Sequence, residues 1–248
     1  MSFKDHFSGH ATDYARYRPH YPPELFAYLA GLSPRQRLAW DCATGNGQAA
    51  LGLALHFDEV IATDASAQQI ATAEPHPRVS YRVAAAEASG LPAGSVDLVT
   101  VAQALHWFDF DTFYAEVRRV SAPGGLLAVW VYDLLRLGPE LDSVLRRYHD
   151  EVVGPYWPLE RHWVDECYRT IPFPFEERVA PAFEIRLRAP LAGLLGYLGT
   201  WSAAKRYQRE RGNDPLDLVR RDLAAAWGPP ETEREWVWPI WLRIGQMG

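Results

Sequence analysis

Between residues 37 and 131, short apolar runs alternate with stretches whose apolar residues recur at helical spacing. Runs of strand length predict β-strands at Arg37–Ala43, Glu59–Asp64, Val79–Ala84, Val96–Ala102 and Leu126–Val131. The intervening stretches predict helices at Gln48–Phe57, Ala67–Ala73 and Asp111–Val120, and Pro123-Gly124-Gly125 predicts a turn before the fifth strand. Strands that alternate with helices build parallel βαβ units. The pattern therefore predicts an α/β fold with a doubly wound, mostly parallel sheet.

The regular alternation ends after Tyr132. Further helices are predicted at Glu24–Leu32, Leu141–Val153, Leu191–Arg211 and Pro215–Trp227, and further strands at Phe183–Leu187 and Trp236–Ile244. Pro239 lies inside the last run and favours an edge strand or a bulge, because proline has no N–H for a strand ladder. We expect these strands to complete a seven-stranded sheet, and the proline-rich loop at 154–182 to form a lid.

Composition places the chain among globular proteins. Its 248 residues are enough for one large domain, or for one domain with a lobe, and 48% apolar with 23% charged residues exclude disorder or a coiled coil as the main architecture. The net charge of −6, without a basic block, argues against nucleic acid as a partner, since duplex binding relies on many cationic contacts to phosphate. No apolar run approaches the roughly 18 residues of a membrane span. We expect a small-molecule partner, and a monomer or homodimer.

The cysteines and histidines predict neither a cross-link nor a metal site. Cys42 and Cys167 stand too far apart for a CxxC motif, and none of the eight histidines falls in an HxH or HExxH pattern. The first residues, Met-Ser-Phe-Lys-Asp-His, have neither the basic nor the apolar region of a signal peptide. We expect a reduced, cytoplasmic protein without a bound metal.

A glycine-containing turn follows the first predicted strand. Gly45-x-Gly47-x-x-Ala50 satisfies the spacing of a dinucleotide-binding turn, and Asp64 ends the second predicted strand. The same spacing also serves a plain strand-to-helix turn that needs two glycines. Because ligands of doubly wound sheets bind at the carboxyl ends of the strands, the position of this turn favours an adenosine-containing ligand.

Asp41 distinguishes between two ligands of this kind. It stands just before the glycines, at the mouth of the turn. A nicotinamide dinucleotide places a pyrophosphate over the helix N-terminus, where a nearby carboxylate would repel it. A carboxylate suits the ammonium and sulfonium of S-adenosylmethionine instead. Asp41 therefore favours S-adenosylmethionine.

The chain resembles the class I S-adenosylmethionine-dependent methyltransferases, in particular the type 11 group that includes trans-aconitate methyltransferase-like proteins. Asp41-x-x-x-Gly45-x-Gly47 is similar to the family's glycine motif, with Ala43 in place of the usual first glycine, and Asp64-Ala65-Ser66 is similar to its acidic strand end. Ala86-Glu87, followed by Leu91-Pro92 and Ser95-x-Asp97, resembles the segment that meets the adenine amino group. Residues 102–108, Ala-Gln-Ala-Leu-His-Trp-Phe, resemble the type 11 signature at the floor of the active site. The resemblance implies a Rossmann-like methyltransferase fold.

The resemblance also implies roles for single residues. Asp64 would hold both ribose hydroxyls, and Gln69 lies where relatives often carry an apolar residue against adenine. The segment Tyr14-x-x-Tyr17-Arg18-Pro19-x-Tyr21-Pro22 is similar to a start common in the group and would close over the cofactor; alternatively, it is an amphipathic helix that packs its tyrosines on the sheet edge. We expect S-adenosylmethionine to contact Tyr14, Tyr17, Arg18, Asp41, Ala43, Thr44, Gly45, Gly47, Asp64, Ala65, Gln69, Ala86, Glu87, Gln103 and Ala104.

These assignments divide the chain into three parts. We expect residues 1–36 to cap the cofactor site and residues 37–135 to form the cofactor-binding core. Residues 136–248 would complete the sheet and carry an acceptor lid at about 154–211. Most of the ten tryptophans fall in this last part, which predicts an acceptor site with aromatic walls.

His106 is the candidate catalytic residue. An imidazole can take a proton from a hydroxyl acceptor, whereas a carboxylate acceptor needs no base, and a histidine packed beside Trp107 fits the sequence equally well. Arg161, Arg206 or both could pair with an acidic acceptor. Contacts to the acceptor are expected from Tyr21, His106, Trp107, Trp163, Trp201 and Arg206, and further candidates are Trp157, Arg161, His162, Asp165, Tyr168 and Tyr197.

The expected function is transfer of the S-adenosylmethionine methyl group to a carboxylate or hydroxyl of a small molecule. Two alternatives stay open at the level of sequence. One is a non-catalytic S-adenosylmethionine-binding protein, and the other is an NAD-dependent oxidoreductase with a degenerate turn, against which Asp41 argues.

Overall fold

The computed structural model describes residues 19–248. Its strands are β1 (Leu38–Cys42), β2 (Glu59–Asp64), β3 (Val79–Val83), β4 (Val96–Ala102), β5 (Ser121–Tyr132), β6 (Glu176–Arg178), β7 (Phe183–Ala189) and β8 (Arg234–Gln246). Its α-helices are α2 (Pro23–Leu32), α3 (Gln48–Leu53), α4 (Ala67–Ala71), α5 (Phe110–Val120), α6 (Pro139–Arg147), α7 (Arg161–Asp165), α8 (Leu191–Gly199), α9 (Ser202–Arg211) and α10 (Arg220–Trp227). Short 3-10 or π turns are η2 (Leu105–Trp107), η3 (Tyr148–Val152), η4 (Gly154–Tyr156) and η5 (Pro215–Leu218).

The strands form one mixed sheet in the order β3-β2-β1-β4-β5-β8-β6. Strands β1 to β5 run parallel, and β8 is antiparallel to β5. Both β6 and β7 pair with β8, at its end near Gln246 and from Ile240 to Arg234 respectively. They act as one interrupted strand, so the eight strands occupy seven positions across the sheet. The predicted doubly wound, seven-stranded architecture is therefore confirmed.

Each face of the sheet is buried, because neighbouring residues on a strand point to opposite sides. On β5, Leu126, Ala128 and Trp130 belong to one apolar cluster, together with side chains of α2, α3 and the C-terminal helices. The intervening Leu127 and Val129 belong to the other cluster, with side chains of α5. Two-sided burial explains why the central strands are continuous apolar runs in the sequence.

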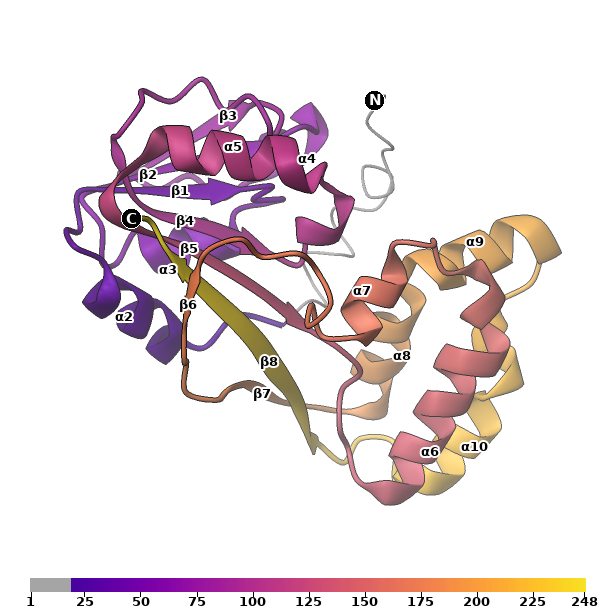
Figure 1. Cartoon of the computed structure of the whole chain (residues 1–248). Coiled ribbons are helices and arrows are strands. Elements are labelled where there is room, and N and C mark those ends of the chain that lie inside the picture. The colour runs from indigo at the N-terminus through magenta and orange to yellow at the C-terminus, as the bar shows by residue number, and fades with distance from the viewer. Residues whose placement is uncertain (1–18) are drawn as a thin grey trace.

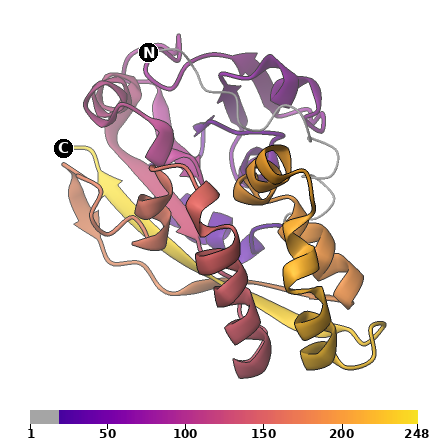
Figure 2. The ribbon, with the colours of Figure 1, turned by 90° about the vertical axis from the view of Figure 1, so that its right-hand side faces the viewer.

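A helical lobe lies beyond the carboxyl ends of β4 and β5 (Figure 1). It contains α6, α7, α8, α9 and α10. Figure 2 shows the molecule from the side on which this lobe lies. Between α7 and α8 the chain returns to the sheet edge as β6 and β7. The predicted lid at about 154–211 therefore does not form one unit: its middle is part of the sheet, while α6 and α10 join the lobe.

Residues 19–36 differ from the predicted cap. Helix α2 begins with Pro23 at a position where a missing N–H costs nothing. Its Leu25, Phe26 and Leu29 are buried in the apolar cluster on the α3 side of the sheet. This part of the chain therefore covers a sheet face, and the remainder of the predicted cap lies outside the described residues.

Three local predictions also need correction. Pro123-Gly124-Gly125 lies inside β5 rather than before it, as an irregularity between the pairs Val96–Ser121 and Leu98–Leu126. The predicted single helix at 191–211 is two helices, which meet at Trp201. Pro239 lies where β8 has partners on β7 but not yet on β5, since pairing with β5 begins at Ile240. β8 is an inner strand of the sheet, but at Pro239 it has a neighbouring strand on one side only.

No helix among residues 19–248 has both the length and the apolar character needed to cross a membrane.

Candidate functional site

The turn after β1 has a backbone that few residues adopt. Ala43, Gly45 and Gly47 have φ values of 54°, 58° and 93°, the left-handed region that glycine occupies without steric penalty. Ala43 takes this conformation although it carries a Cβ. The positive φ at Gly47 disfavours any other residue, and a Cβ there would lie 2.3 Å from the hydroxyl oxygen of Tyr81, which would have to move. Among residues 19–248, a Cβ on Gly45 would meet only Gln69 Oε1, at 4.0 Å, so no other described residue crowds the backbone there.

Asp41 is fully buried beneath this turn. Its two carboxylate oxygens accept hydrogen bonds from the hydroxyls of Thr44, at 2.5 Å, and Thr100, at 2.8 Å. Burial raises the pKa of Asp41 to about 6, although both hydrogen bonds act in the opposite direction. The ionised carboxylate therefore lacks a cationic partner among the described residues that shift its pKa, and a positively charged ligand would stabilise it.

Asp64 joins the end of β2 to the glycine turn. One carboxylate oxygen accepts the N–H of Gly45 at 2.9 Å, and the other accepts the N–H of Ser66 at 2.8 Å. The charges of Asp41, Glu87 and Asp64 all raise the pKa of the buried Cys42 thiol, after burial itself. Three carboxylates thus gather around the end of β1, where the predicted cofactor site lies.

The remaining residues predicted to bind the cofactor lie along the same edge. Gln69 is buried on α4 and Ala65 is exposed just before it, while Ala86 is buried beside the half-buried Glu87. After β4, Gln103 adopts a φ of 59°, and its side-chain amide donates to the carbonyl of Tyr132 at 3.0 Å. This hydrogen bond joins the carboxyl ends of β4 and β5. The next residue, Ala104, is buried.

Asp97 does not belong to this edge. It lies at the start of β4 and accepts the backbone N–H groups of Arg37 and Leu38, at 3.1 and 3.2 Å. Its other oxygen pairs with Arg35 at 3.2 Å. The expectation that Ser95-x-Asp97 meets the adenine amino group is therefore wrong, because strand polarity puts Asp97 at the amino end of the sheet.

A cavity lies between the end of the sheet and the helical lobe. It is lined by Gln103, His106, Trp107, Tyr132, Asp133, Leu134, Trp157, Pro158, Arg161, Val164, Tyr197, Trp201 and Ser202. Trp201 is the centre of its aromatic wall, with ring centroids 5.6 Å from Trp157 and 5.9 Å from Tyr197. The cavity is thus aromatic on the lobe side, as the distribution of tryptophans predicts.

His106 lines this cavity from η2. Its Nδ1 lies 2.7 Å from the hydroxyl oxygen of Tyr168, and its ring packs 4.6 Å from that of Trp107. Burial, and to a smaller degree the charge of Arg161, lower the pKa of His106 to about 3. The imidazole is therefore neutral at physiological pH and a weak base.

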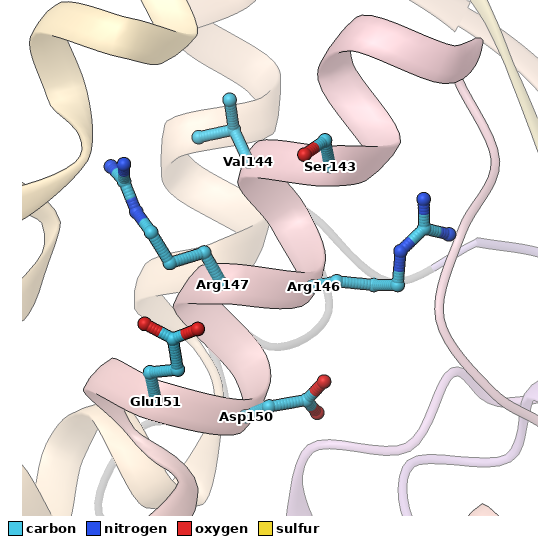
Figure 3. A pocket seen from close by; sticks show the side chains of 6 residues that line it. All are labelled: Ser143, Val144, Arg146, Arg147, Asp150 and Glu151. Atoms are coloured by element: carbon cyan, nitrogen blue, oxygen red, sulfur yellow. The ribbon is translucent and has the colours of Figure 1, made fainter.

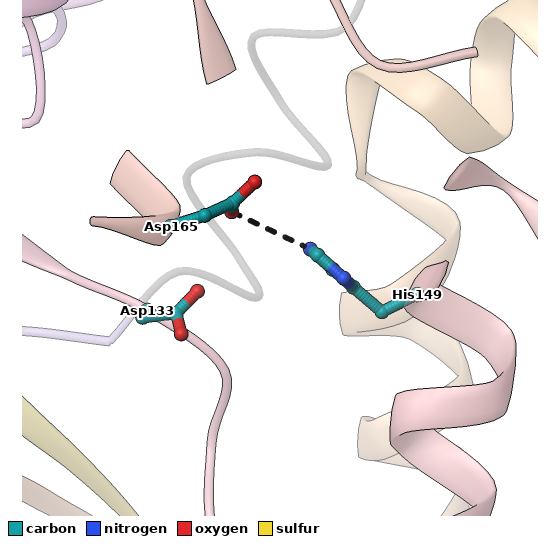
Figure 4. A group of neighbouring side chains, drawn as sticks. All are labelled: Asp133, His149 and Asp165. Atoms are coloured by element: carbon teal, nitrogen blue, oxygen red, sulfur yellow. Dashed lines mark ion pairs between the residues drawn. The ribbon is translucent and has the colours of Figure 1, made fainter. Parts of the chain in front are cut away.

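Arg161 supplies the cavity's positive charge. Its guanidinium contacts Asp133 at 3.0 Å and Asp165 at 2.8 Å, and lies 4.6 Å from the ring centre of Trp157. Asp133, His149 and Asp165 converge in Figure 4, with ligand-type atoms within 4.8 Å of one another. Arg161 also lies 3.3 Å from His149 Nε2, so a cation of the chain already occupies this group.

The structure brings only some of the predicted acceptor residues to the cavity. His106, Trp107 and Trp201 line it, as do the further candidates Trp157, Arg161 and Tyr197. Tyr21 packs against Trp130 and Tyr132 beside the cavity, whereas Trp163 packs against Phe110 in the other apolar cluster. His162 is exposed on α7, and its Nδ1 donates a hydrogen bond to the carbonyl of Leu159 at 2.7 Å.

Arg206 lies away from this cavity. It is half-exposed on α9 and pairs with Glu210 one helical turn later, at 2.8 Å. The structure therefore does not support Arg206 as an acceptor contact. Tyr14, Tyr17 and Arg18 lie outside the described residues, and their contacts with the cofactor stay a prediction.

Sequence reasoning missed Asp133 and Leu134. Both follow directly after β5, and functional side chains of doubly wound sheets gather at the carboxyl ends of strands. That rule, applied to the fifth strand as it was to the first and second, could have found Asp133.

A second hollow lies on the outer surface of the lobe (Figure 3). It is lined by Ser143, Val144, Arg146, Arg147, Asp150 and Glu151, all from α6 and η3. Arg147 pairs with Asp222 of α10 at 2.6 Å, which fastens two lobe helices together. No predicted site residue lies there.

Comparisons with known proteins agree with this geometry. A family model described as a methyltransferase domain matches residues 40–129. A protein of Dictyostelium discoideum named as a methyltransferase is 33% identical over 229 residues, 91% of this chain and 87% of its own length. The structure of a protein described as a type II methyltransferase, from Anaeromyxobacter dehalogenans, is 48% identical, with a TM-score of 0.88 over 93% of this chain and 98% of that one.

A more distant structure shares the fold alone. A methyltransferase from an antibiotic biosynthesis pathway of Anabaena variabilis is 18% identical, with a TM-score of 0.54 over 90% of this chain and 98% of that one. None of these descriptions names an acceptor, so the resemblance to trans-aconitate methyltransferases stays a prediction.

Proposed function

The chain belongs to the class I S-adenosylmethionine-dependent methyltransferases, and on that premise we propose that it methylates a carboxylate or hydroxyl oxygen of a small molecule. The observation that carries the proposal is the position of the cavity. It begins at Gln103 and His106, directly after β4, and is closed by aromatic side chains of the lobe. A small acceptor held there lies next to the edge that carries the glycine turn.

The residues around the turn fit S-adenosylmethionine. Within residues 19–248, the surroundings of Gly45 let a ligand approach the backbone, and Asp41 offers a carboxylate whose pKa burial raises to about 6. Asp64 already orients both oxygens through two backbone N–H groups, which presents its remaining lone pairs in a fixed direction. We assign Asp41 to the cationic methionine part and Asp64 to the ribose hydroxyls.

The chain's own residues contribute mainly position and exclusion of water. When bound, S-adenosylmethionine supplies an electrophilic methyl group on a sulfonium. Gln103 holds the ends of β4 and β5 together at 3.0 Å, and therefore fixes the floor on which the two reactants meet. Trp157 and Trp201 keep the acceptor side apolar. Holding two reactants in line can account for a large part of a rate enhancement.

Two polar groups in the cavity can recognise the acceptor. Arg161 offers a guanidinium that suits a carboxylate, and His106 offers a ring nitrogen that suits an acceptor oxygen. A hydroxyl acceptor would need a base, whereas a carboxylate is already a nucleophile. Both oxygen acceptors are compatible with an aromatic wall of this kind.

Binding of S-adenosylhomocysteine tests the proposal directly. We expect saturating ligand to raise the melting temperature of the wild type, by a free energy of about 2.7 kcal/mol at a concentration one hundred times the Kd. Asp64→Ala should lose this increase relative to its own ligand-free form. Asp97→Asn is the matched control, since it perturbs backbone contacts at the opposite end of the sheet and should keep the increase. Equal increases in both variants would contradict the assignment.

Transfer is then measured with a labelled methyl group. Purified protein, labelled S-adenosylmethionine and a panel of small carboxylic acids, phenols and alcohols should yield label in an ester or ether. Binding of the cofactor without transfer to any member of the panel would contradict the proposed acceptors.

A further inference from the structure

Tyr168 and His106 form a buried pair at the base of the cavity. Tyr168 follows α7 and is fully buried, 62 residues from His106 along the chain. Its hydroxyl oxygen lies 2.7 Å from Nδ1 of His106, so the two side chains are hydrogen-bonded. His106 lines the cavity while Tyr168 does not. The imidazole therefore has a protein-facing nitrogen, Nδ1, and a second nitrogen, Nε2, for which residues 19–248 provide no hydrogen bond.

The direction of this hydrogen bond follows from the buried surroundings of the Tyr168 hydroxyl. Burial raises the pKa of Tyr168 well above its usual range, so the phenol keeps its proton. Within residues 19–248, Nδ1 of His106 is the hydrogen-bond partner that the structure gives the buried phenol. A buried hydroxyl proton without an acceptor would be costly, so the phenol donates its proton to Nδ1 of His106. A neutral imidazole that accepts at Nδ1 carries its own proton on Nε2.

We propose that Tyr168 fixes His106 as the Nε2–H tautomer, and that His106 donates a hydrogen bond to the acceptor, which restricts methylation to carboxylate oxygens. The proposal rests on the proposed function, since it places the acceptor in this cavity. Tyr168 is a positioning residue here, because it acts only through His106.

A carboxylate suits such a donor, whereas a neutral hydroxyl does not. An ionised carboxylate can accept hydrogen bonds from both His106 and Arg161, which both line the cavity. Arg161 uses Nη2 for Asp133, at 3.0 Å, and Nε for Asp165, at 2.8 Å, so the N–H groups of Nη1, for which residues 19–248 provide no hydrogen bond, are the ones that an acceptor carboxylate can use. A hydroxyl acceptor would have to lose a proton, and an Nε2–H group has no lone pair to receive it.

The reaction balances without a proton transfer. A lone pair of the carboxylate oxygen forms the new carbon–oxygen bond as the carbon–sulfur bond breaks, and the bonding electrons leave with sulfur. The negative carboxylate and the positive sulfonium become a neutral ester and a neutral thioether. His106 neither gains nor loses a proton in this step; its pKa, lowered to about 3 by burial, agrees with an imidazole that does not take up a second proton.

Nitrogen NMR of ring-labelled histidine tests the tautomer without any acceptor. Signals assigned to His106 by their loss in His106→Gln should show a proton on Nε2 and an unprotonated Nδ1 at pH 7. Tyr168→Phe should shift them to a mixture of tautomers. Tyr114→Phe is the control, since Tyr114 is equally buried in the same apolar cluster but donates to the carbonyl of Pro172. A proton on Nδ1 in the wild type, or unchanged signals in Tyr168→Phe, would overturn the proposal.

Substitution of His106 separates a donor from a base in the reaction. Glutamine can donate an N–H near the position of Nε2 but cannot take a proton at neutral pH. With carboxylic acids as probes, we expect His106→Gln to keep kcat/KM within about tenfold of wild type, and His106→Ala to lose more, about tenfold to a hundredfold. If the wild type methylates neutral alcohols and both His106→Gln and His106→Ala lose that activity to the same extent, His106 acts as a base and the proposal is overturned. If the wild type does not bind S-adenosylhomocysteine, the proposed function is refuted. The NMR result still decides the tautomer in that case.

Discussion

The ionisation of Asp41 gives a quantitative prediction for cofactor binding. Burial raises its pKa from 3.8 to about 6 in the folded protein. Each pKa unit corresponds to about 1.36 kcal/mol, so the ionised form is disfavoured by about 3 kcal/mol relative to an exposed aspartate. Because the folded protein holds this proton more tightly than the unfolded chain, the contribution of Asp41 to stability is present below about pH 4 and is lost as the pH rises to about 6.

A cation bound beside Asp41 reverses this preference. If the ligand restores the ordinary pKa, it binds the ionised form and releases the proton from any protonated Asp41. Affinity for S-adenosylmethionine should then be about tenfold higher at pH 7 than at pH 5, since about nine tenths of the free protein is protonated one unit below a pKa of about 6. The ligand's own amino group, with a pKa of about 8, keeps its charge over this range.

Isothermal titration calorimetry between pH 5 and pH 7.5 measures both consequences. Buffers with different ionisation enthalpies should reveal release of nearly one proton on binding at pH 5. Asp41→Asn should bind more weakly and show no such pH dependence. Thr100→Val removes a hydrogen bond that lowers the pKa of Asp41, so it should move the inflection to higher pH. An affinity that is constant from pH 5 to pH 7 in the wild type, or a slope that persists in Asp41→Asn, would refute the reasoning.

Three further predictions concern single positions. Gly47→Ala should lower the free energy of unfolding by about 2 kcal/mol or more, because alanine would have to adopt a left-handed backbone conformation and its Cβ would lie 2.3 Å from the hydroxyl oxygen of Tyr81. An unchanged thermal melt would contradict this. Arg161→Ala should lower kcat/KM for a carboxylate acceptor by about tenfold to a hundredfold, whereas Arg206→Ala, which breaks only an exposed pair, should leave it unchanged; equal effects would contradict the placement of the cavity. Glu116→Gln should destabilise the fold by about 1–3 kcal/mol at pH 7 in chemical denaturation, since it removes the charge that Arg119 pairs with at 2.7 Å and replaces one acceptor oxygen with a donor. Arg119 and the Ser89 hydrogen bonds lower the folded pKa of Glu116 from 4.5 to about 2, so the difference from wild type should shrink as the pH falls towards 2, and a constant difference would contradict this.

The cofactor edge follows closely from sequence because its signals are local. The predicted strands at Glu59–Asp64 and Val96–Ala102 have the bounds that the structure gives, since both are mostly apolar and almost entirely buried. The positive φ values at Gly45 and Gly47 are likewise properties of the turn itself. Asp97 lies away from the cofactor edge although it is close in sequence to Ala86-Glu87, because β4 begins at the opposite end of the sheet.

The acceptor side could be predicted only in part. Arg161 and Arg206 look alike in sequence, but α7 lies against the end of β5, where Asp133 receives Arg161, while α9 turns Arg206 outward. The i, i+4 spacing of Arg206 and Glu210 was a readable sign of a solvent-exposed helical pair. No comparable local sign exists for Tyr168, whose partner lies 62 residues away.

The sequence by itself therefore determined the doubly wound sheet, the glycine turn and the acidic residues that end its first two strands. These depend on alternation, backbone conformation and strand polarity, which act over a few residues. The tertiary structure alone decided which aromatic and charged side chains of the lobe face the cavity, and that His106 presents Nε2 rather than Nδ1. Those outcomes depend on packing between segments far apart in the chain, where burial and hydrogen-bond direction are set by neighbours that no local pattern identifies.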